Sequence, residues 1–118
     1  MTSYAVLLPG DESTWATATA EQRAAMYAKH SRFAELLAER GHKMTGGAEL
    51  TFSNTARIVS GSLDSVTVTD GPYAETTEQL TGFYTVESDD LDDLLNIAGI
   101  LTENGGRVEV RACVDHSG

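Results

Sequence analysis

DGPYAETTEQLTGFY, residues 70–84, is the stretch of the sequence on which the predicted fold depends. The Thr- and Val-rich residues 65–69 before it alternate as a β-strand does, and this strand ends at Asp70. Gly71-Pro72 predicts a sharp reversal, because proline fixes its own backbone and glycine adopts conformations that other residues avoid. A polar loop follows, and an aromatic strand is predicted over residues 82–87. The stretch therefore predicts two strands joined by a defined loop.

A hairpin is predicted just before this stretch. Residues 56–60 have a strand pattern and pair with residues 65–69 across the turn at residues 61–64. The preceding residues 42–55 are the least defined part of the chain. Their features are a Gly46-Gly47 bend and a short strand around Leu50 and Phe52.

The two ends of the chain also predict strands. Residues 3–8 are apolar and end at Pro9-Gly10, and the small polar residues 11–18 are expected to form a loop. Residues 107–114 alternate between apolar and polar side chains, which predicts the last strand.

Two helices lie between these strands. Thr19 and Gln22 have the spacing of a capping box, and Gly41 supplies a left-handed stop, which predicts a helix of about twenty residues. Ser88 is expected to cap the second helix, with acidic residues in its first turn. The expected buried stripes are Met26, His30, Phe33 and Leu37 in the first helix, and Leu91, Leu94, Leu95, Ala98 and Leu101 in the second.

The order strand, helix, strands, helix, strand predicts one α+β domain over residues 1–118, a mainly antiparallel sheet with two helices on one face. The central strands are apolar on both faces, as Leu7 and Leu8 in the first strand and Phe83 and Tyr84 in a later one illustrate. Soluble monomers seldom expose such a face, so a homodimer through the sheet is expected. The alternative is that residues 42–55 fold over the open face.

The composition limits the classes of partner. Eight basic and eighteen acidic residues give a formal charge of −10, which argues against direct binding of nucleic acid. No apolar run approaches the ~20 residues of a membrane span, so no membrane partner is expected. A single cysteine, Cys113, and the absence of a basic segment before Tyr4 favour a cytoplasmic protein without a secretory signal.

The sequence resembles the DGPF family, a branch of the YCII-related proteins, at residues 69–76, where Tyr73 replaces the Phe of the motif. The similarity continues through residues 78–80, 82–84, 88–92 and 108–111. The resemblance implies a ferredoxin-like fold and a dimer of the dimeric α-β barrel type. The family's function is poorly defined. In the wider group a neighbouring His and Asp point to enzyme activity, some relatives act on chlorinated hydroxyquinols, and other DGPF proteins are encoded near or joined to extracytoplasmic-function sigma factors.

His30 and Asp70 are the candidate catalytic pair. His30 lies on the apolar stripe of the first helix, which aims it at the sheet, and Asp70 ends a strand at a tight turn. If they meet, Asp70 can orient the imidazole and His30 can move protons near neutral pH. The family's His–Asp pair maps onto these two positions. The alternatives are a core histidine satisfied by one hydrogen bond, and an aspartate that bonds its own turn.

Tyr73, Glu75 and Arg57 are the candidate ligand-binding residues. Tyr73 and Glu75 lie on the loop after the turn, which can line a cleft, and Arg57 lies on a strand, where it can bind an anion. The alternatives are a Tyr packed at the core rim, a solvated acid and an Arg paired with a neighbouring Glu such as Glu109. No cofactor and no metal are expected, because no Gly-rich phosphate loop or metal-ligand spacing is present.

Two functions remain open from the sequence, and whether the chain is an enzyme is undecided. The first is a small-molecule lyase or isomerase that uses the His–Asp pair. The second is a non-catalytic ligand-binding or accessory protein that acts through partners such as a sigma factor.

Overall fold

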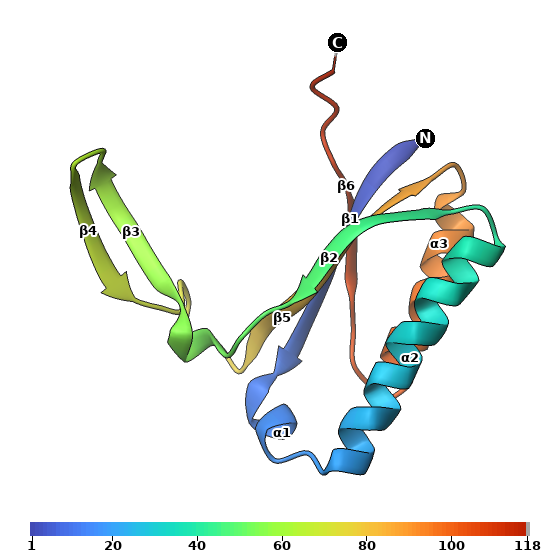
Figure 1. Cartoon of the computed structure of the whole chain (residues 1–118), viewed down its shortest axis with the longest axis horizontal. Coiled ribbons are helices and arrows are strands. Elements are labelled where there is room, and N and C mark those ends of the chain that lie inside the picture. The colour runs from blue at the N-terminus through green and yellow to red at the C-terminus, as the bar shows by residue number, and fades with distance from the viewer. Residues whose placement is uncertain (118) are drawn as a thin grey trace.

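A four-stranded antiparallel sheet with helices on one face forms the body of the chain, and a separate hairpin projects from it (Figure 1). The computed structural model describes residues 1–117. The elements are β1 (Thr2–Asp11), α1 (Glu12–Ala16), α2 (Ala20–Glu39), β2 (Lys43–Glu49), η1 (Ser53–Thr55), β3 (Arg57–Ser62), β4 (Ser65–Asp70), β5 (Glu78–Ser88), α3 (Leu91–Ala98), η2 (Gly99–Thr102) and β6 (Glu109–Ala112).

The sheet order is β2-β5-β1-β6, and every neighbouring pair is antiparallel. With α1 and the hairpin β3–β4 set aside, the chain runs β-α-β-β-α-β through this sheet. That order is consistent with a ferredoxin-like fold and confirms the predicted α+β class.

The capping chemistry predicted for α2 is present. The Thr19 hydroxyl accepts a hydrogen bond from the backbone N–H of Gln22 at 3.1 Å, and the Gln22 side chain accepts one from the backbone N–H of Thr19 at 2.8 Å. Gly41, just beyond the helix, has a φ of +82°. Of the predicted stripe of α2, Phe33 and Leu37 are buried, and Met26 and His30 are partly buried.

The second helix starts two residues later than predicted, and its predicted stripe is correct at Leu94, Ala98 and Leu101 but wrong at Leu91 and Leu95. The cap is Asp90, whose carboxylate accepts from the backbone N–H of Asp93 at 3.1 Å, and Ser88 lies two residues earlier. Leu91 and Leu95 are exposed. The buried stripe of α3 and η2 is instead Leu94, Ile97, Ala98 and Leu101.

Several boundaries differ from the predicted ones. The expected loop at residues 11–18 contains α1, which Asp11 caps by accepting from the backbone N–H of Ser13 at 2.9 Å. β5 begins at Glu78 rather than at residue 82 because it pairs with β1 as far as Asp11, across a bulge. β6 is shorter than residues 107–114, and Val114 is 77% exposed.

One core lies between the helices and the sheet. Val6 of β1 and Val86 of β5 are completely buried against Phe33 and Leu94. On the other face of the sheet, Leu7 lies opposite Phe83, and both are partly exposed. One alternative placed residues 42–55 over that face, but residues 43–49 form the edge strand β2 of the same sheet.

The hairpin β3–β4 forms a sheet of its own. The predicted strands are confirmed, but the turn contains two residues, Leu63 and Asp64, rather than four, and Asp64 has a φ of +65°. Figure 1 shows the hairpin standing away from the helices and from the four-stranded sheet. We call residues 57–70 the arm.

Candidate functional site

His30 and Tyr84 form a hydrogen-bonded pair between α2 and β5. The Nδ1 atom of His30 lies 2.7 Å from the hydroxyl oxygen of Tyr84. The Tyr84 ring also packs against the core residue Phe33, with 5.3 Å between ring centroids. His30 and Tyr84 are each partly buried. The pair therefore lies at the rim of the core, where Phe33 holds the Tyr84 ring in place.

Burial and one carboxylate set the protonation states of the pair. Burial lowers the pKa of His30 below its ordinary value of 6.5, and the Glu49 carboxylate partly opposes that change. Burial raises the pKa of Tyr84 above 10.0, and Glu49 raises it further. At neutral pH the imidazole is therefore uncharged and the phenol keeps its proton. In the tautomer whose Nδ1–H donates to the phenol oxygen, the Nε2 atom can accept a proton and the phenol hydroxyl can donate to another group.

Glu49 is held beside the pair by Tyr27. The Tyr27 hydroxyl lies 2.8 and 3.1 Å from the two carboxylate oxygens of Glu49. Tyr27 in turn packs edge-on against Trp15, with 5.6 Å between ring centroids. The carboxylate is thus placed by α2 and α1, although it belongs to the sheet edge, and it gives this region a negative potential.

An open hollow of about 390 Å³ borders Tyr84 and residues 44–47 of β2. Gly47 is required for this close approach, since a Cβ atom there would lie 2.6 Å from the carbonyl oxygen of Phe83 and 2.7 Å from Cδ1 of Tyr84. Its φ of +154° also disfavours a side chain. The sequence indicated only a bend at this position.

Asp70 and Arg57 lie at the base of the arm, directly opposite each other in the β3–β4 ladder. Arg57 Nη1 is 3.5 Å from Asp70 Oδ1, and both side chains are largely exposed. Arg57 is therefore paired with a carboxylate, but the partner is Asp70 rather than a Glu such as Glu109, which pairs with Arg111. The structure does not bring Asp70 to His30 within one protomer, because the arm and α2 lie on different sides of the molecule (Figure 1).

Tyr73 and Glu75 lie on the loop after the arm. Tyr73 is 93% exposed, so it does not pack at the core rim. Glu75 borders a second, smaller hollow of about 270 Å³ that Asp11, Glu12 and Pro72 also line. The five predicted site residues are therefore divided between the His30 region and the arm with its exit loop.

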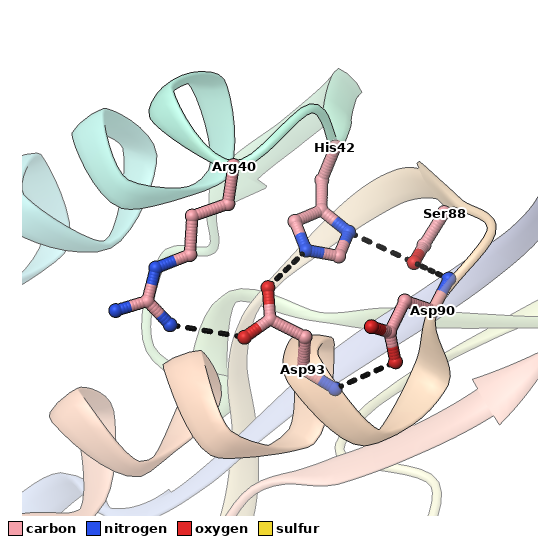
Figure 2. Close-up of polar contacts among 5 residues, drawn as sticks. All are labelled: Arg40, His42, Ser88, Asp90 and Asp93. Carbon is pink, nitrogen blue, oxygen red and sulfur yellow. Dashed lines mark hydrogen bonds and ion pairs between the residues drawn. The ribbon is translucent and has the colours of Figure 1, made fainter.

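A second polar cluster, not predicted from the sequence, surrounds His42 (Figure 2). Its Nδ1 atom lies 2.8 Å from Ser88 Oγ and its Nε2 atom 2.8 Å from Asp93 Oδ2. Arg40 donates to the other carboxylate oxygen of Asp93 at 2.9 Å, and the backbone N–H of Asp90 donates to Ser88 Oγ at 2.9 Å. The hydrogen bond from His42 is the main reason that the pKa of Asp93 lies below its ordinary value of 3.8.

This cluster has the residue types of a catalytic triad but fastens the fold. Ser88 is 1% exposed and His42 is 7% exposed, so a substrate cannot reach the hydroxyl. The cluster instead joins the residues after α2 to the start of α3, and each polar atom of the imidazole has a partner. No spacing in the sequence signals it, since His42 and Asp93 are 51 residues apart.

Two further observations concern residues 1–117. No three His, Cys, Asp or Glu side chains in this part of the chain come together in a group that could hold a metal ion. None of the helices described there is both long enough and apolar enough to cross a bilayer.

Comparison with known proteins places the chain in a family. Residues 2–112 match the model of the YCII-related domain. An uncharacterized protein of Rhizobium meliloti (strain 1021) is 34% identical over 111 residues, which cover 92% of this chain and 89% of that protein. The match spans the sheet, both long helices and the arm, so the shared unit is the whole domain. The chain belongs to the YCII-related domain family.

Proposed function

We propose that the chain binds a small molecule in the hollow beside Tyr84 and transfers a proton to or from it, as a lyase or isomerase does. His30 acts as the acid–base group and Tyr84 is its hydrogen-bond partner. The observation that carries the proposal is the 2.7 Å contact between His30 Nδ1 and the hydroxyl of Tyr84, a residue that lines an open hollow.

The protonation states support this assignment. The lowered pKa of His30 leaves the imidazole neutral at pH 7, so it is ready to accept a proton. The raised pKa of Tyr84 keeps its hydroxyl available as a donor to an oxygen on which negative charge develops. Glu49 makes the surroundings negative, so we expect neutral or cationic carbonyl compounds to bind better than carboxylic acids.

Tyr84 orients the imidazole of His30, the role that was predicted for Asp70. Asp70 pairs with Arg57 on the arm, and Tyr84 is the group in contact with the imidazole. The motif around Asp70 and Tyr73 supports placing the chain in the DGPF branch of the family. Asp70 and Tyr73 are exposed at the base and exit of the arm, and this position favours a role of the motif in assembly rather than in catalysis.

The test measures exchange of carbon-bound hydrogen with solvent. A panel of neutral and cationic ketones is incubated with the protein in D₂O, and deuterium incorporation next to the carbonyl is followed by NMR. His30→Asn and Tyr84→Phe should each lower the exchange rate at least tenfold, whereas Asp70→Asn should leave it unchanged. Loss of exchange in Asp70→Asn alone would return the orienting role to that residue, and equal rates in all variants would end the proton-transfer proposal.

Binding without chemistry is the second candidate, since the hollow and the donor groups serve it equally well. Chemical-shift changes at residues 44–47 without deuterium incorporation in any compound that binds would favour it.

We also propose that the open face of the sheet packs on a second copy. The facing residues Leu7 and Phe83 are partly exposed there, and the helices cover only the opposite face. Sedimentation as a single protomer at high micromolar concentration would overturn this assembly.

A further inference from the structure

Valines form most of one face of the arm, and serines and threonines form most of the other. In the β3–β4 ladder Val59 lies opposite Val68, and Gly61 lies opposite Val66, so the three valines share one face, with the Arg57–Asp70 pair at its base. The other face carries serine and threonine side chains at positions 60, 62, 65, 67 and 69, together with Ile58 opposite Thr69. Such alternation is typical of a ribbon with one buried face.

That apolar face has no cover within the described protomer. Val59, Val66 and Val68 are 62%, 56% and 54% exposed, and Leu63 at the tip is 89% exposed. The radius of gyration of 16.4 Å exceeds the ~13 Å expected for a compact domain of this length, as a projecting arm requires. An isolated two-stranded hairpin is marginally stable in water, so an arm of this shape needs a surface to pack on.

The arm is fastened at its base, which fixes its direction. Glu12 accepts hydrogen bonds from the backbone N–H of Ser53 at 2.6 Å and from its hydroxyl at 2.5 Å. The backbone N–H of Gly71 donates to the carbonyl of Ala56 at 2.8 Å, just below the ladder. The valine face is therefore presented outward by the fold and cannot turn back onto its own sheet without breaking these contacts.

We propose that two copies of this chain exchange arms, each packing its valine face against the other copy. The inference rests on the sheet-face dimer proposed above and adds the arm to that interface. In a two-fold symmetric dimer, each copy would cover the open sheet face and the valine face of the arm of the other copy.

The size of the arm favours this occupant. Four strands about 5 Å apart and about 25 Å long on average give the sheet face about 500 Å² in projection. The arm, two strands wide and about 20 Å long, adds about 200 Å². The arm therefore adds a substantial share to the surface that a second copy can cover.

The low charge of the arm permits contact with a second copy. The protomer carries a formal charge of −10, so two copies repel each other over most of their surfaces. The arm has one basic residue, Arg57, and two acidic residues, Asp64 and Asp70, which leaves it at −1. A partner with the same acidic surface can therefore approach the arm at little electrostatic cost.

Analytical ultracentrifugation of the full chain tests the proposal with a matched pair of variants, Val68→Asp and Thr67→Asp. Both variants place the same charged residue in β4, at adjacent positions on opposite faces of the arm. The wild type should sediment as a dimer, Val68→Asp should raise the dimer dissociation constant at least tenfold, and Thr67→Asp should change it less than twofold.

A third variant separates the arm from the sheet face. Ala48 is exposed on β2 and lies opposite Phe83, so Ala48→Asp places a charge on the open face without entering the core. Dissociation by Ala48→Asp with no effect of Val68→Asp would overturn the arm exchange and leave the sheet-face dimer intact. A monomeric wild type would overturn both, and neither result bears on the exchange assay for His30.

Discussion

The Nδ1 atom of His30 lies 2.7 Å from the Tyr84 hydroxyl, and this hydrogen bond directly links α2 to the central strand β5. Tyr84 is at the same time a core residue, since its ring packs on Phe33. A substitution at His30 should therefore alter the packing of Tyr84 in the core. A ligand in the hollow that Tyr84 lines should in turn alter the hydrogen bond between Tyr84 and His30.

Removal of the Tyr84 hydroxyl should destabilise the fold modestly. Tyr84→Phe keeps the ring on Phe33 but leaves the partly buried Nδ1 of His30 without its partner, which costs about 1 kcal/mol. Urea denaturation measures the difference. Tyr4→Phe is the matched control, because Tyr4 packs on the same core and its hydroxyl has no hydrogen-bond partner within residues 1–117. Equal losses in the two variants would contradict a special role for the Tyr84 contact.

The stability of the protein should depend on the protonation of His30. Its pKa is lower in the folded protein than the ordinary 6.5, so below pH 6.5 the unfolded chain binds more protons at this residue than the folded chain does. The free energy of unfolding should therefore fall as the pH drops from 6.5 through the folded pKa. Above pH 6.5 this contribution should be constant.

The same pH series on His30→Asn isolates this effect from the carboxylates. The difference in unfolding free energy between wild type and variant should shrink or reverse as the pH falls below 6.5. A difference that stays constant between pH 7.5 and 5.5 would show that folding does not change the affinity of His30 for protons.

Asp93 should stabilise the protein only where it is ionised. Its folded pKa is lowered chiefly by the hydrogen bond from His42, so its contribution is present above pH 3.8 and is lost as the pH falls through the folded value. Asp93→Asn should therefore lower stability at pH 6 and have progressively less effect on acidification. Asp92→Asn removes a charge from the same first turn without touching His42 or Arg40, and thermal unfolding of both variants from pH 6 to pH 3 separates the contacts from the helix dipole.

Elements fixed by neighbouring residues were predictable, and those fixed by distant ones were not. The capping box of α2 and the alternation of the arm are both local, and both were predicted correctly. At the start of α3, however, Ser88, Asp89 and Asp90 are all good caps, and the structure uses Asp90 while His42 engages Ser88. The local pattern could not reveal that choice.

The buried stripe of α3 was ambiguous for a related reason. Leu91, Leu94, Leu95 and Ala98 have the same helical spacing as the observed stripe one turn later, so only the packing against the sheet decides between them. The hydrogen-bond partner of His30 could not be predicted for the same reason, since Tyr84 lies 54 residues away in the sequence and no spacing rule connects the two residues.

Gly47 should be the residue whose substitution disturbs the site most without removing any polar group. A Cβ atom at position 47 meets the carbonyl of Phe83 and the ring of Tyr84, and it requires a φ of +154°, so Gly47→Ala should cost about 1–3 kcal/mol. Because the clash pushes on Tyr84, the imidazole resonances of His30 should shift as well. Gly46→Ala is the matched control, since its Cβ atom would meet only the Thr85 hydroxyl, at 3.1 Å. A Gly47→Ala protein with unchanged stability and unchanged His30 resonances would show that β2 does not hold Tyr84 in place, and the hollow would then lose its connection to the His30–Tyr84 pair.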